Sequence, residues 1–166
     1  MQRMSTDLRH EIISTSSEQT EQLGRLIGAN MKGGETIQLV SDLGGGKTTL
    51  TKGFVAGIGC KAMVSSPTFT ISKEYKGTHV TLKHFDFYRL TEAGIMQHEL
   101  QEDIKDTSSV VVIEWADIIR SVLPEDTITI TLRFVNEHDR KIIISAPQLR
   151  HYILKGLEWY LPYEQI

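Results

Sequence analysis

Residues 41–48, SDLGGGKT, have the composition and spacing of a loop that binds the phosphates of a nucleotide. The pattern for such loops is G-x-x-x-x-G-K-[ST], and Ser41 stands at its first position in place of glycine. Backbone N–H groups converge on an anion only where no side chain blocks the approach, and residues 44–46 are all glycine. Lys47 would reach the β- and γ-phosphates, and the Thr48 hydroxyl would bind Mg²⁺.

The flanking sequence decides between a phosphate loop and a glycine-rich turn with a solvated lysine. Residues 36–40, TIQLV, have the β-branched composition of a strand, and residues 48–59 carry apolar side chains at helical spacing. A helix that begins at the loop adds partial positive charge and unpaired N–H donors, which favours the phosphate loop. Because Ser41 is small, we expect it to adjust the loop backbone modestly and to change nucleotide affinity without destroying the site.

A nucleotide site of this kind also needs a carboxylate near the metal, and the sequence offers two. Glu114 ends the apolar segment VVVIE, and an apolar parallel strand delivers its last residue to the crevice where ligands bind. Asp86 lies in KHFDFYR, a less apolar segment. One carboxylate could bind Mg²⁺ directly or through water, and the other could orient the attacking water. The sequence motifs alone do not decide which of the two carboxylates binds Mg²⁺ and which orients the water.

These residues need a scaffold in which strands and helices alternate. Hydrophobic periodicity and the turn residues between segments predict such an order, with no element before residue 15. The predicted helices cover residues 15–34, 47–58, 91–100 and 147–161, and the predicted strands cover residues 36–40, 69–75, 80–88, 109–115, 126–135 and 140–145. The fold class is therefore α/β: a three-layer domain whose mixed, mostly parallel sheet has a C-terminal antiparallel hairpin.

Length, charge and cysteine content limit what this chain can be. Its 166 residues are 40% hydrophobic, which suffices for one core, so we expect a single domain over residues 1–166. A formal net charge of -3 excludes a large basic surface, so a nucleic-acid role would need a partner or a small local patch. Cys60 is the single cysteine, which excludes an internal disulfide. With no secretory or membrane-spanning segment in the sequence, we expect a cytoplasmic protein.

Four ordered motifs, SDLGGGKTTL, SSPTFTI, HFDFYRL and VIEWAD, resemble those of the TsaE (YjeE) family. That family comprises small bacterial P-loop ATPases required for threonylcarbamoyladenosine modification of tRNA. The resemblance covers roughly residues 16–140 and implies the P-loop NTPase fold, with ATP and Mg²⁺ as cofactors. It also implies two partners, a TsaD-type transferase that modifies the adenosine beside the anticodon and a TsaB-type subunit. Contact with tRNA would be indirect, through that complex. Because the sequence has no segment long enough to span a membrane, we expect no membrane partner.

The resemblance further implies roles for individual residues. Thr48 and Glu114 would bind Mg²⁺, Lys47 and Asp86 would be catalytic, and residues 66–70 would face the γ-phosphate as a switch-like segment. The other implied nucleotide contacts are Asp42, Leu43, Gly44, Gly45, Gly46, Thr49, Thr68 and Trp115 beside the phosphates, with Ser17 and His138 flanking the base. Ser41 is the one departure within a motif.

Two other classes of protein could use the same loop. A small-molecule or nucleotide kinase would transfer the phosphate to an acceptor, but such enzymes carry an arginine-rich lid, which this sequence lacks. A nucleotide-dependent binding module would have little turnover, because the bound state itself carries the signal. A GTPase is disfavoured, because the sequence has no N-K-x-D element for guanine.

Overall fold

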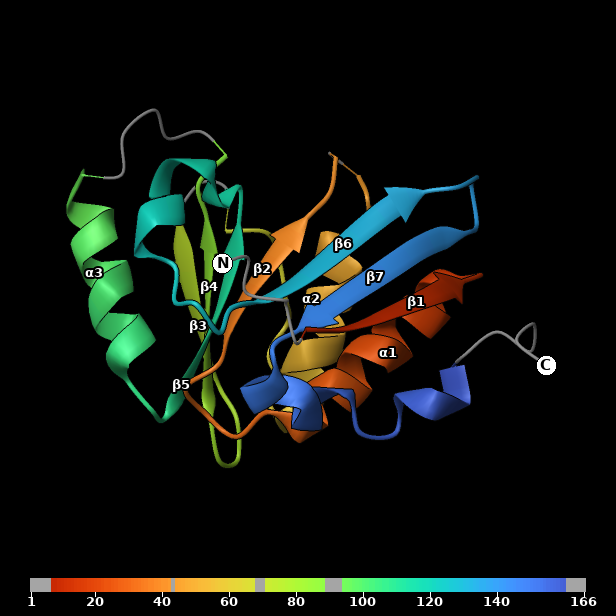
Figure 1. The fold of residues 1–166 in the computed structure, drawn as a ribbon, viewed down its shortest axis with the longest axis horizontal. Helices are drawn as coiled ribbons and strands as arrows, with labels where there is room; N and C mark the ends of the chain where they lie inside the picture. The colour runs from red at the N-terminus through yellow and green to blue at the C-terminus, as the bar shows by residue number, and fades with distance from the viewer. Residues whose placement is uncertain (1–6, 43, 68–70, 89–93, 161–166) are drawn as a thin grey trace, which may run out of the picture.

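Seven strands form one mixed sheet over the residues that the structure describes, which are 7–42, 44–67, 71–88 and 94–160 (Figure 1). The structure is a computed structural model. The strands lie in the order β1-β7-β6-β2-β5-β4-β3. Their bounds are β1 (Leu8–Ser14), β2 (Thr36–Val40), β3 (Ser72–Lys76), β4 (Thr81–Asp86), β5 (Ser109–Glu114), β6 (Ile128–Phe134) and β7 (Arg140–Ala146). The α-helices are α1 (Ser17–Asn30), α2 (Lys47–Gly57) and α3 (Gly94–Lys105), and the 3-10 helices are η1 (Ala116–Val122), η2 (Gln148–Leu154) and η3 (Leu157–Tyr160).

The central strands β6, β2, β5 and β4 run parallel to one another, and antiparallel strands flank them at both edges. β7 and β1 extend the sheet beyond β6, while β3 pairs with β4 at the opposite edge. The predicted mixed sheet with a parallel centre is therefore confirmed, as is the late antiparallel hairpin, formed by β6 and β7.

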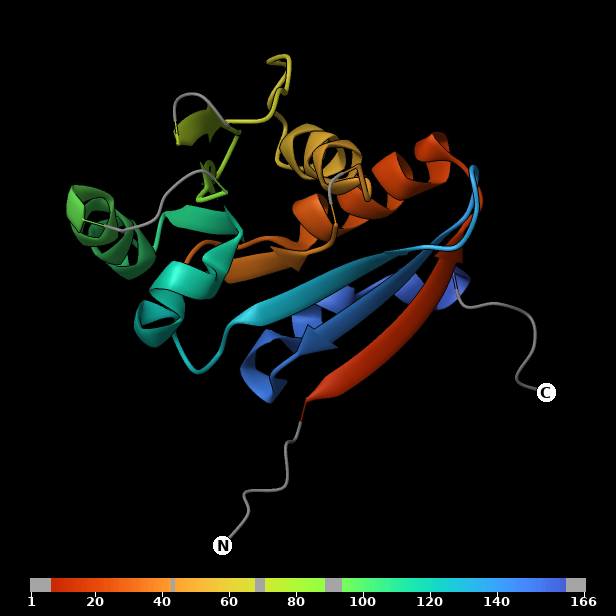
Figure 2. The same ribbon diagram turned by 90° about the horizontal axis from the view of Figure 1, so that it is seen from above.

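Helices cover both faces of this sheet, which confirms the predicted three layers. α1 and α2 pack together on one face, and α3 and η1 lie on the other (Figure 2). The first layer buries Leu23 and Phe54 in its core, and the second buries Leu100 and Ile119. Among the described residues, no helix combines the length and apolarity needed to cross a bilayer.

α1 and α2 touch backbone to backbone because glycine stands at their points of closest approach. A Cβ atom added to Gly24 of α1 would lie 2.3 Å from the carbonyl oxygen of Leu50, and one added to Gly53 of α2 would lie 2.2 Å from that of Glu21. Any side chain at either position would force the helices apart, because interiors are close-packed. This contact fixes the N-terminal end of α2, where the glycine loop ends, against α1.

The N-terminal strand β1 is absent from the sequence prediction. Of its seven residues only Ile12 and Ser14 are buried, so the segment has little hydrophobic periodicity. It forms because it can pair with β7, from Leu8 opposite Ala146 to Ser14 opposite Arg140. The strand therefore depends on a partner more than 100 residues away in the sequence.

The predicted C-terminal amphipathic helix over residues 147–161 is wrong, because the chain forms two 3-10 helices there, η2 and η3. Gly156, with a φ of +88°, separates them. The side-chain amide of Asn30 donates to the carbonyl oxygens of Ile153 (3.1 Å) and Lys155 (2.8 Å). Asn30 of α1 thus forms hydrogen bonds with carbonyl groups that would accept backbone N–H groups within a continuous helix.

Candidate functional site

The glycine loop runs from the end of β2 to the start of α2, which confirms the predicted order of strand, loop and helix. Gly44 and Gly46 have φ angles of 76° and 101°, in the left-handed region that favours glycine. Gly46 directly precedes α2, so the partial positive charge of the helix N-terminus lies at the loop. Leu43, a predicted phosphate contact, lies outside the described residues.

Lys47 is buried, with 8% of its surface exposed, and its ammonium group contacts the loop that precedes it. Nζ donates to the carbonyl oxygens of Ser41 (3.3 Å) and Asp42 (3.4 Å) and lies 5.1 Å from the centroid of the Trp115 ring. These hydrogen bonds are long for an N–H donor. A phosphate oxygen would bind the ammonium more strongly than the two neutral carbonyls do.

Asp86 and Glu114 come from adjacent parallel strands. β4 and β5 pair so that Asp86 lies opposite Glu114. Side chains alternate along a strand, and Leu82 and Val112, which share the parity of the two carboxylates, belong to the core beneath α1 and α2. The carboxylates therefore lie on that same face at the carboxyl ends of the strands, where parallel sheets bind ligands.

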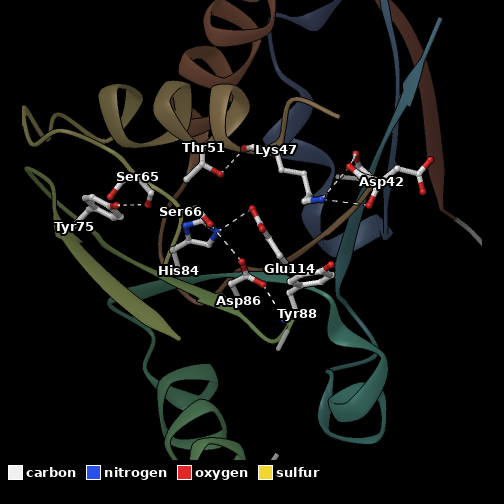
Figure 3. A network of polar contacts seen from close by, with 11 residues as sticks. Asp42, Lys47, Thr51, Ser65, Ser66, Tyr75, His84, Asp86, Tyr88 and Glu114 are labelled. Atoms are coloured by element: carbon white, nitrogen blue, oxygen red, sulfur yellow. Dashed lines mark hydrogen bonds and ion pairs between the residues drawn. The ribbon is translucent and has the colours of Figure 1, made fainter. Parts of the chain in front are cut away.

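Hydrogen bonds hold both buried carboxylates in place (Figure 3). Oδ1 of Asp86 accepts the backbone N–H of Tyr88 at 2.9 Å, and Oδ2 accepts the Ser66 hydroxyl at 3.4 Å. Oε1 of Glu114 lies 3.2 Å from Nε2 of His84, whose ring is 1% exposed. Each carboxylate is thereby held in a defined orientation.

A cavity of about 560 Å³ connects the glycine loop with the two carboxylates. Its lining residues are Gly44, Gly45, Gly46, Lys47, Thr48, Thr49, Ser66, Asp86, Tyr88, Glu114 and Trp115. Trp115 has a φ of 56°, and its ring centroid lies 4.8 Å from that of Tyr88. The structure thus brings most of the predicted phosphate contacts together with the predicted catalytic and metal-binding residues.

Ser17 and His138, the residues predicted to flank the base, line a second cavity of about 360 Å³. Ser17 begins α1, and His138 lies in the turn between β6 and β7. This second cavity shares Gly44, Gly46 and Thr49 with the first. The two predicted base contacts therefore lie beside the glycine loop, although they come from distant parts of the sequence.

One predicted nucleotide contact, Asp42, differs from this arrangement. Asp42 lines neither of the two cavities, and borders a third one beyond Trp115. Its carbonyl oxygen accepts a hydrogen bond from Lys47, so the backbone of Asp42 takes part in the loop. Thr68 lies outside the described residues.

His84 and Tyr88 belong to this site, although their motif assigned neither of them a role. His84 contacts Glu114, and Tyr88 both lines the cavity and donates its backbone N–H to Asp86. They lie two residues before and two residues after Asp86. The sequence carries a signal for His84, because residues i and i−2 of a strand share a face and His84 lies two residues before Asp86.

The oxygen donors of the first cavity suit Mg²⁺. The Thr48 hydroxyl and the Glu114 and Asp86 carboxylates all line it. Mg²⁺ commonly binds one or two carboxylates together with phosphate oxygens and waters, and seldom sits in an all-protein cage. Over the described residues, no three His, Cys, Asp or Glu side chains form such a cage. The residues therefore fit a metal ion that arrives with a nucleotide.

Comparisons with known proteins relate this chain to one family of sequences. The family described as "Threonylcarbamoyl adenosine biosynthesis protein TsaE" matches residues 14–142. The "tRNA threonylcarbamoyladenosine biosynthesis protein TsaE" of Bacillus subtilis (strain 168) is 34% identical over 141 residues, which cover 85% of this chain and 88% of that protein. Its counterpart of the same name in Treponema pallidum (strain Nichols) is 36% identical over 134 residues, covering 80% and 98%.

The fold agrees with these sequence comparisons. The crystal structure of Bacillus subtilis YdiB matches with a TM-score of 0.75 and 29% identity, covering 93% of this chain and 97% of that one. The span matched by the family contains the glycine loop, Asp86, Glu114 and Trp115. On the agreement of family, relatives and fold, this chain belongs to the TsaE family.

Proposed function

We propose that this protein binds ATP with Mg²⁺, hydrolyses it slowly, and acts as an accessory ATPase in the threonylcarbamoyladenosine modification of tRNA. Its partners would be a TsaD-type transferase and a TsaB-type subunit in the cytoplasm. The observation that carries the proposal is the cavity in which the glycine loop faces Asp86 and Glu114, in a chain of the TsaE family. The net charge of -3 supports contact with tRNA through partners and not through a basic surface of its own.

The glycine loop would bind the triphosphate. Backbone N–H groups of Gly46 and of the first turn of α2 would donate to the phosphate oxygens, and the N-terminus of α2 adds partial positive charge. Lys47 would exchange the carbonyls of Ser41 and Asp42 for the β- and γ-phosphates. The base would occupy the second cavity, between Ser17 and His138.

The carboxylates would divide two tasks. Thr48 and Glu114 would hold Mg²⁺, which when bound supplies charge neutralisation to the β- and γ-phosphates. Asp86 would accept a hydrogen bond from the attacking water and so orient it in line with the γ-phosphate. The Tyr88 N–H and the Ser66 hydroxyl fix the direction of the Asp86 carboxylate for that task.

The division of tasks is tested with Asp86→Asn and Lys47→Ala. Asp86→Asn keeps the shape of the side chain and an oxygen that can accept the Tyr88 N–H, so we expect ATP binding to persist while turnover falls by about 10²-fold or more. Lys47→Ala should weaken ATP binding as well as turnover, because it removes the cation at the phosphates. The matched control is Lys52→Ala, an exposed lysine on α2, which should change neither quantity. Normal hydrolysis in the Asp86 or Lys47 variant would refute the assignment.

The accessory role is tested by measuring ATP hydrolysis by the protein alone, then with both partners, then with tRNA added. We expect stimulation in the assembled mixture, and loss of tRNA modification when the Lys47→Ala variant replaces the wild type. Transfer of the γ-phosphate to a small acceptor in the absence of partners would instead identify a kinase.

A further inference from the structure

His84 lies in the second row of side chains behind the first cavity, where it contacts Glu114 without lining the cavity itself. Its Nε2 atom is 3.2 Å from Oε1 of Glu114, and both side chains are almost fully buried. The other ring nitrogen, Nδ1, is buried and has no hydrogen-bond partner among the described residues. A proton on Nδ1 would have no acceptor there, whereas a proton on Nε2 can be donated to Glu114, so the geometry favours Nε2–H as the donor.

An apolar residue would fill this position at lower cost if packing were its only task. Two neighbours of His84 are buried in the apolar core. Leu82 lies two residues before it on the same face of β4, and Val112 of β5 pairs with it. Burying an imidazole among such side chains costs free energy unless its polar atoms are hydrogen-bonded. Nε2 of His84 is hydrogen-bonded to Glu114, and Nδ1 has no partner among the described residues. Packing alone therefore does not account for a histidine at this position.

The geometry points to His84 as a positioning residue for Glu114. By donating Nε2–H to Oε1, it would hold the carboxylate of Glu114 in one orientation in the cavity that Thr48 also lines. The second oxygen, Oε2, would then be the one that binds the metal. His84 does not line the cavity, so it would act on the metal only through Glu114. This inference rests on the proposed function, because it takes Glu114 to be a metal ligand. Hydrogen-bond partners of metal ligands typically change metal affinity by about 10- to 100-fold when they are removed.

The test compares three substitutions of His84 by their effect on metal affinity. His84→Phe keeps a ring but removes the donor, His84→Asn carries an amide too short to reach Glu114, and His84→Gln can place an amide N–H close to the position of Nε2. The affinity of the protein for Mn²⁺, used in place of Mg²⁺, is measured by electron paramagnetic resonance with a non-hydrolysable ATP analogue bound. Affinity for the analogue in EDTA is measured by calorimetry.

We expect His84→Phe and His84→Asn to weaken Mn²⁺ binding by about 10-fold or more, while metal-free analogue affinity stays within about 2-fold of wild type. His84→Gln should recover most of the Mn²⁺ affinity. In a Glu114→Gln background, His84→Phe should have no further effect on Mn²⁺ binding, because the carboxylate through which His84 acts is gone. His79→Gln is the matched control. His79 is hydrogen-bonded to the Met31 carbonyl and does not line the first cavity, so this substitution should leave both affinities unchanged.

A merely structural role for His84 would give a different result. All three substitutions would then lower thermal stability, and they would weaken metal-free and metal-dependent binding alike, with no rescue by His84→Gln. That pattern, or Mn²⁺ affinity of His84→Phe and His84→Asn within about 2-fold of wild type, would overturn the inference. If His84→Phe does not fold, the comparison of His84→Asn with His84→Gln decides the question alone. Failure of the wild type to bind the analogue at all would refute the proposed function instead.

Discussion

Ser41 and Gly45 fit together at the start of the glycine loop. The Ser41 hydroxyl donates to the carbonyl of Asp42 at 2.8 Å, and a Cβ atom on Gly45 would lie only 1.6 Å from that hydroxyl oxygen. The serine side chain therefore occupies space that Gly45 leaves open. This contact explains how the loop accommodates serine at a position where its sequence pattern has glycine.

The fit between these two residues predicts unequal effects of substitution. Ser41→Gly should change ATP affinity by less than about 10-fold, because it removes a side chain without creating a clash. Gly45→Ala should weaken ATP binding more, since the added methyl forces Ser41 and the loop backbone to move. The double variant Ser41→Gly/Gly45→Ala should bind ATP better than Gly45→Ala alone. Calorimetric titration of the three variants measures these differences, and additive effects would contradict the prediction.

At the scale of elements, η2 is anchored to the turn before β2 by a polar cluster. The Tyr152 hydroxyl donates to Oε1 of Glu35 at 2.6 Å, and Arg150 donates to the Tyr152 hydroxyl and to the carbonyl of Gly34. Glu35 is 1% exposed. Burial, and secondarily the contact with Glu35, raises the pKa of Tyr152 to about 12. This cluster holds the C-terminal 3-10 segment against the start of the strand that leads to the glycine loop.

Tyr152→Phe should lower the free energy of unfolding by about 1 to 3 kcal/mol at neutral pH, because it removes a donor from the buried Glu35. The tyrosine pKa is raised in the folded protein above its unfolded value of about 10, so its contribution is complete below pH 10 and is lost as the pH rises through 12. As the pH rises from 10 to 12, the free energy of unfolding should therefore fall less in Tyr152→Phe than in the wild type. Urea unfolding at several pH values measures this difference, with Tyr88→Phe as the control. The same pH dependence in Tyr152→Phe and in the wild type would be evidence against the prediction.

At the scale of the whole molecule, the candidate site joins separate parts of the fold. The first cavity takes residues from the glycine loop, from the ends of β4 and β5 and from the segment before β3. The second adds the start of α1 and the β6–β7 turn. A nucleotide that spans both cavities would contact elements from most of the sheet and should stabilise them together.

Binding of ATP with Mg²⁺ should therefore raise the melting temperature. At a ligand concentration 100 times the Kd, mass action adds about 2.7 kcal/mol. For a chain of this size we expect a shift of about 5 to 10 °C. Differential scanning fluorimetry with a non-hydrolysable analogue measures it. Lys47→Ala should show a much smaller shift at the same concentration, and an equal shift in that variant would mean that the ligand binds elsewhere.

The sequence by itself determined the local chemistry of this protein. The loop could be recognised because its glycines, Lys47 and Thr48 are consecutive, and because apolar periodicity marks the strand before it and the helix after it. The four motifs were sufficient to indicate the TsaE family and its fold. Each of these signals lies within a short segment, where the spacing of apolar side chains directly reflects the local secondary structure.

Only the tertiary structure decided which distant residues meet. The register of β4 and β5 sets Asp86 opposite Glu114, and that pairing also brings His84 within hydrogen-bonding distance of Glu114. The formation of β1 on β7 and the division of the C-terminal segment into η2 and η3 likewise depend on partners far away in the chain. Periodicity shows which face of a segment is buried, but the partner and its register are set by long-range packing.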